Sequence, residues 1–401
     1  MSTLSASNGH AAPPPATVQA SSSTGGITED EAALYDRQLR LWGVEAQNRM
    51  RQAKVLIVNF RSLAAEIAKN IVLAGVGQVT LLDEQNVHEQ DLGANFFLRE
   101  DDVGQKVSRT LRREAPSGRV GPREPTRDSL VPNPFLPQRI QVGAPRLQAL
   151  NPRVELLTRT DAALVQDDTF LAQFDLVVLT DCDAPTLQRV NESTRRLGKK
   201  LYAASSVGID GWIFADLLEH EFVVDVIKSL GPGETVNVPT KRTLSYTPFD
   251  SILSHSWKKS RARELRKTQS NLWGTLGKFH LNNYFLKHGH AEIRFSEFRL
   301  RVALLEYQRT NPGQPITLEG LKSTSQELLP RLGVKTELLP ETILSRIAST
   351  SAFEFPPSAA ILGGIAGQDV LNVLGGKEEP VRNLMVFDGQ TGAGHVWNLG
   401  E

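Results

Sequence analysis

Short apolar runs alternate with stretches of helical spacing through the first half of the chain. Residues 54–58, KVLIV, hold four consecutive apolar positions, which is typical of a strand covered on both faces. Residues 63–74 repeat apolar side chains at helical spacing and are followed by a glycine, and residues 78–82, QVTLL, form a second apolar run. We therefore expect a strand, a helix and a strand over residues 54–83, about 30 residues, which is the length of a right-handed parallel crossover.

The same alternation returns further along the chain. It predicts strands at 154–157, 176–179, 200–203 and 211–218, with helices at 167–173 and 184–197 between them. An Ala- and Gly-rich helix at 358–374 then leads into a strand at 383–387, which we expect to rejoin the first sheet. Strands that alternate with helices indicate an α/β fold, here a doubly wound, mostly parallel sheet with a smaller, mostly helical insert.

Composition divides the chain into four parts. Residues 1–26 contain no Asp, Glu, Lys or Arg and are rich in Ser, Ala, Pro and Gly. Such a segment buries too little apolar surface to offset the conformational entropy lost on ordering, so its composition predicts a disordered tail. Thr28 then caps a predicted helix, and residues 27–225 form the first part of the α/β domain. Polar linker sequence and helical patterns fill residues 226–349, and residues 350–401 complete the α/β domain.

Residues 111–146 interrupt this rhythm where a crossover helix is expected. They contain seven prolines and seven arginines against three acidic residues, and so many prolines are incompatible with a helix. We predict a disordered insert, which an unspliced intron would explain, because the flanking segments DDVGQ and VGAPRLQALNP would join into a helix without it. A genuine surface loop is the alternative.

The charge balance and the cysteine count narrow the classes of function. The 401 residues include 45 Lys plus Arg and 45 Asp plus Glu, so no overall field attracts nucleic acid or an acidic membrane surface. The single cysteine, Cys182, excludes an intrachain disulfide framework and zinc sites built on CxxC pairs. Because no apolar run is long enough to cross a bilayer and no leader pattern precedes Thr28, we expect a soluble, intracellular protein.

The turn after the first strand is where a parallel sheet of this kind would bind a nucleotide. Residues 59–64 read NFRSLA where a phosphate-binding turn has G-x-G-x-x-G, and the side chains of Arg61, Ser62 and Ala64 would take up the space of the ligand. Asp83 follows at the position of a ribose-binding carboxylate, although a carboxylate that caps the next turn has the same pattern. A dinucleotide-dependent oxidoreductase would share the crossover, but this turn argues against a bound pyrophosphate.

Several segments combine, in a fixed order, into a family pattern. They are YDRQLRLWG at 35–43, KNIVLAGVGQVTLLD at 69–83, DLGANFFL at 91–98, FDLVVLTD at 174–181, AAILGGIAGQDVLNVLG at 359–375 and NLMVFDG at 383–389. This set resembles the ThiF-like, Rossmann-like adenylation fold of the ubiquitin-like-protein activating enzymes. Within that family it is most similar to the smaller, pseudo-catalytic subunit of SUMO-activating enzymes. The corresponding subunit for the Nedd-type modifier shares the first segment and is the alternative, although that chain is typically longer.

The resemblance implies the non-catalytic half of a heterodimer. Active halves of the family carry G-x-G-G-L-G and N-L-N-R-Q-F segments, whereas the matching positions here are Asn59, Arg61, Ser62 and Ala64 in the first and Asp91, Gly93, Ala94 and Asn95 in the second. We therefore expect no catalytic residue, metal site or bound cofactor in this chain. A larger SUMO-activating subunit would bind Mg-ATP, adenylate the C-terminal glycine of SUMO and carry the catalytic cysteine, and the helical insert here would be a cysteine-domain half.

Arg37, in the segment YDRQ, is the residue that the resemblance assigns to the nucleotide. In the family this arginine reaches across the interface to the phosphates in the site of the partner. A planar, permanently charged guanidinium can bind two oxygens at once there and stabilise the departing pyrophosphate. Judged by its neighbours in the sequence alone, Arg37 is a surface arginine that pairs with Asp36 or Glu45. A scaffold with no role at the nucleotide is a further alternative.

For the remaining candidate residues we expect no catalytic or metal-binding role. Cys182 follows a strand, and we expect it to pack, because the nucleophile of the family lies in the larger subunit. His280, His288 and His290 lack a zinc spacing and predict a solvated loop. The basic run Lys258–Lys267 fits a solvated helix face, a contact with an acidic partner or a nuclear import signal, and the resemblance favours the nucleus.

Overall fold

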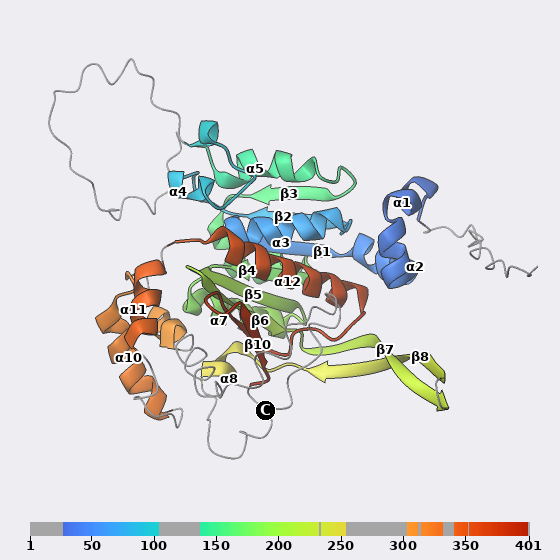
Figure 1. The fold of residues 1–401 in the computed structure, drawn as a ribbon. Helices are drawn as coiled ribbons and strands as arrows, with labels where there is room; N and C mark the ends of the chain where they lie inside the picture. Colours follow the sequence, from blue (N-terminus) through green and yellow to red (C-terminus); the bar gives the residue numbers. More distant parts are fainter. Residues whose placement is uncertain are drawn as a thin grey trace, which may run out of the picture.

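The computed structural model in Figure 1 describes residues 27–103, 137–231, 234–253, 303–311, 314–331, 341–351 and 353–399. Its strands are β1 (Lys54–Val58), β2 (Gln78–Leu82), β3 (Glu155–Arg159), β4 (Leu176–Thr180), β5 (Lys200–Val207), β6 (Asp210–Asp216), β7 (Glu219–Gly231), β8 (Glu234–Ser245), β9 (Leu384–Asp388) and β10 (Ala393–Trp397). Its helices are α1 (Glu29–Leu34), α2 (Asp36–Gln52), α3 (Ser62–Leu73), α4 (Glu89–Leu92), α5 (Arg139–Gln148), α6 (Asp168–Leu171), α7 (Ala184–Arg196), α8 (Phe249–Leu253), α10 (Leu318–Arg331), α11 (Glu341–Thr350) and α12 (Pro356–Gly375). Among these described elements, no helix is long and apolar enough to cross a membrane.

The described strands form one eight-stranded sheet and one two-stranded ribbon. The sheet has the order β10-β9-β6-β5-β4-β1-β2-β3, and its strands from β5 to β3 are parallel, whereas the pairs that involve β6, β9 and β10 are antiparallel. This arrangement confirms the predicted α/β class with a mostly parallel sheet. Strand β9 pairs with β6, so the chain returns to the first sheet after the insert, as the sequence predicts.

Successive residues of the central strands face two different helix layers. Val55 and Ile57 belong to an apolar cluster with α3, α5 and α12, whereas Leu56 belongs to a second cluster with α6 and α7. The uninterrupted run of β1 is therefore buried on both faces, and the sheet is doubly wound. Helix α12 lies so close to α3 that a Cβ built at Gly363 would stand 2.3 Å from the Cβ of Glu66 (Figure 1).

The segment after β6 departs from the predicted organisation. Strands β7 and β8 pair as a ribbon that extends from the body (Figure 1), where the sequence pattern predicts a polar linker and a helical insert from residue 226. The prediction is wrong for residues 226–245. Val236, Val238 and Thr240 place β-branched residues at alternate positions in β8, and Val224 pairs with Thr240 and Val226 with Val238. This period of two is the pattern of a strand.

Beyond the ribbon, the described parts of the predicted insert are helical. They comprise α8, residues 303–310, α10 and α11. Residues 254–302 and 332–340 lie outside the described residues, and so do the basic run Lys258–Lys267, the three clustered histidines and the predicted tail at 1–26. The domain boundaries at 225 and 349 stay predictions.

Helix α5 corrects part of the predicted disorder of residues 111–146. Residues 139–146 are helical, and Pro145 is the proline that lies inside the helix. The other prolines of the segment precede residue 139, so they do not interrupt the helix. Carboxylates balance the arginines of α5, and Arg146 Nη2 lies 3.0 Å from Asp102 Oδ1. Residues 111–136 lie outside the described residues, and the intron hypothesis stays a prediction.

Candidate functional site

The turn after β1 lies at the carboxyl edge of the sheet, where β1, β2 and β4 end. Asn59 has a left-handed backbone conformation with φ of 65°, which asparagine tolerates better than most residues other than glycine. Its side-chain amide donates to the carbonyl oxygen of Thr180 at 2.8 Å and ties the turn to the end of β4. Asn59 therefore keeps a turn of the glycine type but adds a side chain that bonds across it.

A carboxylate from a distant part of the chain lies at the amino end of α3. The backbone N–H of Ser62 donates to Glu354 Oε1 at 3.2 Å, and Arg61 Nε lies 3.6 Å from Glu354 Oε2. The Glu354 side chain is 5% exposed, and burial raises the pKa of its carboxyl group, against the effect of the Arg61 charge. Helix amino ends attract anions because their N–H groups lack partners and the helix dipole is positive there. The carboxylate of the chain itself thus occupies the phosphate-type position.

Both carboxylate oxygens of Asp83 accept hydrogen bonds from other residues of this chain. Its carboxylate accepts from Arg139 Nε at 2.9 Å and Nη2 at 3.1 Å, and from the backbone N–H groups of Phe60 and Gln85, both at 2.9 Å. Arg139 Nη1 also donates to Asp91 at 3.3 Å. Burial alone would lower the pKa of Arg139, but the two carboxylates outweigh it and raise the pKa. Asp83 therefore caps the neighbouring turns and holds an arginine where a ribose would be bound.

The second altered segment, DLGANFFL, is shaped by similar internal bonds. The Asn95 side chain donates to the carbonyl oxygen of Phe60 at 3.0 Å and accepts from the N–H of Phe97 at 3.1 Å. Gly93 ends the short helix α4, and the N–H of Ala94 donates to a carbonyl oxygen in that helix. The segment therefore closes over the turn after β1. We call the turn 59–62, Asp83, Asp91, Arg139 and Glu354 together the carboxyl-edge site.

Sequence reasoning missed two members of this site. Arg139 lies inside the stretch that the prolines predict to be disordered, so its pairing with Asp83 has no local signature. Glu354 is separated from Ser62 by 292 positions, and only the fold brings them together. The available signal is Arg61 itself, because an arginine in a turn meant for phosphate indicates that a negative group must be near it.

Cys182 lies beside the turn but not in a reactive setting. Its Sγ accepts from Asn59 Nδ2 at 3.4 Å, and its side chain packs against the apolar cluster below α7. Burial, with the nearby charges of Asp181 and Asp183, raises the pKa of the thiol far above its usual range, so no thiolate forms at neutral pH. Within the described residues, no group of three or more His, Cys, Asp or Glu could hold a metal ion.

Arg37 lies at the opposite edge of the sheet. Helix α2 carries it and leads into the amino end of β1 (Figure 1), whose five residues span about 16 Å before the carboxyl edge begins. The Arg37 side chain is exposed, and no described carboxylate pairs with it. Asp36 instead pairs with Arg40 at 3.1 Å, and Glu45 with Arg49 at 2.6 Å. The two pairings expected from the neighbouring residues are therefore not formed.

The helical segment around Arg37 is fixed on one side and open on the other. Tyr35 is buried, and its hydroxyl accepts from Asn151 Nδ2 at 2.8 Å. By contrast, three apolar residues within seven positions of Arg37 in the sequence are exposed, with exposed fractions of 57% at Leu34, 68% at Leu41 and 51% at Val44. We call Leu34, Arg37, Leu41 and Val44 the N-terminal face. Apolar side chains around an arginine are a composition found at protein interfaces.

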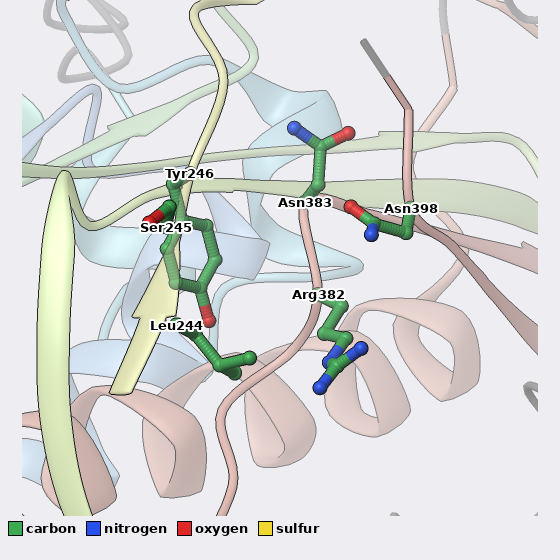
Figure 2. Close-up of a pocket in the computed structure, with 6 residues that line it drawn as sticks. All are labelled: Leu244, Ser245, Tyr246, Arg382, Asn383 and Asn398. Atoms are coloured by element: carbon green, nitrogen blue, oxygen red, sulfur yellow. The ribbon is translucent and has the colours of Figure 1, made fainter. Parts of the chain in front are cut away.

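Two recesses on the surface of the described residues lie near the amino edge, and both are small. One of about 60 Å³ is bordered by Leu41 of α2 and Asp225 of β7. Another of about 20 Å³, shown in Figure 2, is lined by Leu244, Ser245, Tyr246, Arg382, Asn383 and Asn398. Small-molecule sites usually enclose about 300 Å³ or more, whereas the second recess has room for little more than one water molecule. Neither recess is a nucleotide site.

Comparisons with known proteins point to one group. Residues 35–117 match the model of the ThiF family. The DNA damage tolerance protein RHC31 of Saccharomyces cerevisiae is 32% identical over 373 residues, which cover 91% of this chain and 96% of that protein. The SUMO-activating enzyme subunit 1 of Xenopus laevis is 32% identical, with 93% and 97% covered. The protein of the same name from Homo sapiens is 31% identical, with 94% and 97% covered.

The mostly parallel sheet and the altered turn after β1 define a ThiF-type fold whose phosphate-type position is filled from within. The relatives match over nearly their whole length and nearly the whole of this chain. The chain therefore belongs to the SUMO-activating enzyme subunit 1 family, and the resemblance inferred from the sequence is confirmed.

Proposed function

We propose that this chain is the smaller, non-catalytic subunit of a heterodimeric SUMO-activating enzyme that works in the nucleus. A larger partner subunit binds Mg-ATP, adenylates the C-terminal glycine of SUMO and forms the thioester on its own cysteine. This chain completes the adenylation site in trans through Arg37. The observation that carries the proposal is an exposed Arg37 that has no ionic partner among the described residues, at the amino edge of a chain whose carboxyl-edge site is filled by its own side chains.

Mg-ATP does not fit the carboxyl-edge site of this chain. A phosphate would compete with Glu354 for the N–H of Ser62, and a ribose would compete with Arg139 for Asp83. Both competitors are tethered, so their effective concentration exceeds that of a free ligand. The described residues also contain no cluster of metal-binding side chains. We therefore assign no step of the reaction to this site.

The position of Arg37 favours action on another subunit. Tyr35, two positions before Arg37, bonds to Asn151 just before β3, so Arg37 lies near the amino edge of the sheet, opposite the carboxyl-edge site of the same chain. Arg37 cannot reach that site while α2 remains folded. A partner that covers the N-terminal face would bury Leu34 and Leu41 and bring its own site within reach of the guanidinium.

The chemistry of adenylation explains why a guanidinium is useful there. A carboxylate oxygen of the modifier attacks the α-phosphorus of ATP, the bond between the α- and β-phosphates breaks, and pyrophosphate leaves with the negative charge. Arg37 binds that charge as it develops, without needing a change of protonation state. A donor of this kind lowers the barrier by several kcal/mol, so its effect falls on adenylate formation.

Replacing Arg37 in the purified heterodimer tests the proposal. We expect Arg37→Ala to slow SUMO-dependent ATP–pyrophosphate exchange at least tenfold, while gel filtration shows the same heterodimer. Arg37→Lys keeps the charge but loses the planar fork and is expected to recover only part of the rate. Arg40→Ala, three positions away and also exposed, is the matched control and should leave exchange unchanged. Unchanged exchange in Arg37→Ala would remove the role in trans.

A second measurement tests which subunit binds the nucleotide. Isothermal titration of the isolated chain with Mg-ATP should give no binding, and the same titration of the larger subunit or the heterodimer should give one site. Tight binding of ATP to the isolated chain would contradict the proposed division of roles. Replacing SUMO by a Nedd-type modifier in the exchange assay should abolish the signal, which tests the choice of modifier.

A further inference from the structure

A strap of residues Phe353–Phe355 joins α11 to α12 at the carboxyl edge of the sheet. The N–H of Gly208, just after β5, donates to the carbonyl oxygen of Phe353 at 3.1 Å, and Glu354 forms a parallel bridge with Gly208. From this strap the Glu354 side chain reaches the amino end of α3. The strap is thus the point at which the helical insert, the sheet and the turn after β1 meet.

Helix α11 is tied to the same edge by a second ionic contact. Arg346 Nη2 lies 3.1 Å from Asp210 Oδ2 and 3.7 Å from Asp388 Oδ1. Asp210 begins β6 and Asp388 ends β9, and both carboxylates are buried. The chain is therefore held at two points, by Arg346 in α11 before the junction with α12 and by Glu354 within that junction.

The contacts of Glu354 are those that a bound phosphate would make. One carboxylate oxygen accepts from a backbone N–H in the first turn of α3, and the other faces the guanidinium of Arg61. A separate observation marks the same helix end as a polar site, because Ser62 is fully buried and its hydroxyl has no hydrogen-bond partner within the described residues. Helix α3 has 12 residues, long enough for its dipole to act at this end.

We propose that Glu354 is a built-in substitute for a phosphate, which locks the strap against the amino end of α3 and keeps this half of the fold in a ligand-bound arrangement without a ligand. The inference goes beyond the role of Arg37 and does not depend on it. An anion-binding position is present at the amino end of α3 but covered, and removal of the Glu354 carboxylate uncovers it.

Removal of the Glu354 carboxylate leaves two groups that a bound anion can satisfy again. Without the carboxylate, Arg61 loses the opposite charge described beside it, and the N–H of Ser62 loses its acceptor. A buried donor without a partner is costly, so the variant should be less stable than the parent chain. An inorganic anion that enters the position restores both contacts and stabilises only the folded state, which raises the melting temperature with anion concentration.

Thermal unfolding of the full-length chain tests this claim, with inorganic phosphate as the probe. Glu354→Ala should melt below the parent, and millimolar phosphate should raise its Tm by about 3 °C, whereas the parent gains nothing beyond the effect of sodium chloride at equal ionic strength. The double variant Glu354→Ala with Arg61→Ala should lose this gain, because the guanidinium partner is gone. Glu354→Gln keeps the shape of the side chain and provides the second variant if Glu354→Ala does not fold.

The outcomes separate clearly. A phosphate-dependent gain in the Glu354 variants that disappears with Arg61→Ala supports the proposal. It is overturned if the folded Glu354 variants gain no more than the parent, or if the gain persists without Arg61. Either result leaves the role of Arg37 untouched, because pyrophosphate exchange by the heterodimer is measured separately.

Discussion

At the carboxyl edge, Arg139 and Glu354 have exposed side-chain fractions of only 6% and 5%, and both are bonded to other residues of the chain. At the amino edge, Arg37 is exposed and pairs with no carboxylate in the described part of the chain, and the apolar side chains of Leu34 and Leu41 are exposed. The charged groups named here are thus buried and paired at the carboxyl edge of the sheet, and exposed at the amino edge. At the carboxyl edge, the charged groups in the place of a ligand site are paired within the chain, whereas at the amino edge Arg37 has no ionic partner among the described residues and the two recesses found there are too small for a nucleotide.

This contrast shows how a nucleotide-binding type of fold can be kept without an open ligand site at its carboxyl edge. A ligand site needs donors and acceptors that are buried but unpaired until the ligand arrives, and such groups are costly. Here the equivalent groups are satisfied by Arg139 and Glu354, so the carboxyl edge becomes part of the structural core. An arginine that acts on a partner has no such cost, because water solvates it until the interface forms.

The largest effect that the comparison predicts is loss of stability at the carboxyl edge. Arg139→Ala leaves the buried carboxylates of Asp83 and Asp91 without their shared cation, and breaking a buried pair in this way costs about 3–5 kcal/mol. We expect the free energy of unfolding, measured by urea denaturation of the full-length chain, to fall by that amount. Asp83→Asn in the same chain should recover part of the loss.

Arg40→Ala provides the control for this measurement. Its side chain is 78% exposed and, where the structure is described, pairs with Asp36 alone, so its removal should change the free energy of unfolding by less than about 1 kcal/mol. A similar, small loss in Arg139→Ala and Arg40→Ala would show that the carboxyl-edge site is not held by buried charge pairs. The contrast between the two edges would then disappear.

A smaller effect is expected at the N-terminal face. Leu41 is 68% exposed, so Leu41→Ser should leave the stability of the isolated chain unchanged. If the larger subunit covers this face, the same substitution removes buried apolar area from the interface and should weaken the heterodimer about tenfold, measured as the Kd by surface plasmon resonance. Ile361→Ser, an exposed apolar residue of α12, is the matched control and should leave the Kd unchanged. Equal affinities for all three proteins would place the interface elsewhere.

Local patterns in the sequence predict much of this organisation. The uninterrupted run KVLIV identifies a central strand, and Thr28 forms the expected capping box with Glu31 at the start of α1. The loss of glycines from residues 59–64 also indicates an altered phosphate turn. These features depend on residues close together in the chain, where the period of apolar positions and the capping residues carry the information.

The contacts that fill the site depend on residues far apart, and the sequence alone does not predict them. Glu354 is 292 positions from Ser62, and Arg139 is 56 positions from Asp83, within a stretch whose prolines suggest disorder. The ribbon of β7 and β8 was missed for a different reason. Its polar and charged residues suggest a linker, although Val236, Val238 and Thr240 are β-branched residues at alternate positions, which is the pattern of a strand.

The smallest expected effect concerns Cys182, which lies next to the altered turn. Its buried thiol stays protonated at neutral pH, and its contact with Asn59 is a weak one that a serine hydroxyl can replace. We expect Cys182→Ser to leave the rate of SUMO thioester formation by the heterodimer unchanged, as followed on non-reducing gels. A lost thioester would place the nucleophile in this chain and would contradict the division of roles between the two subunits. An unchanged rate is expected if the nucleophile lies in the partner and Cys182 has a structural role at the carboxyl edge of this chain.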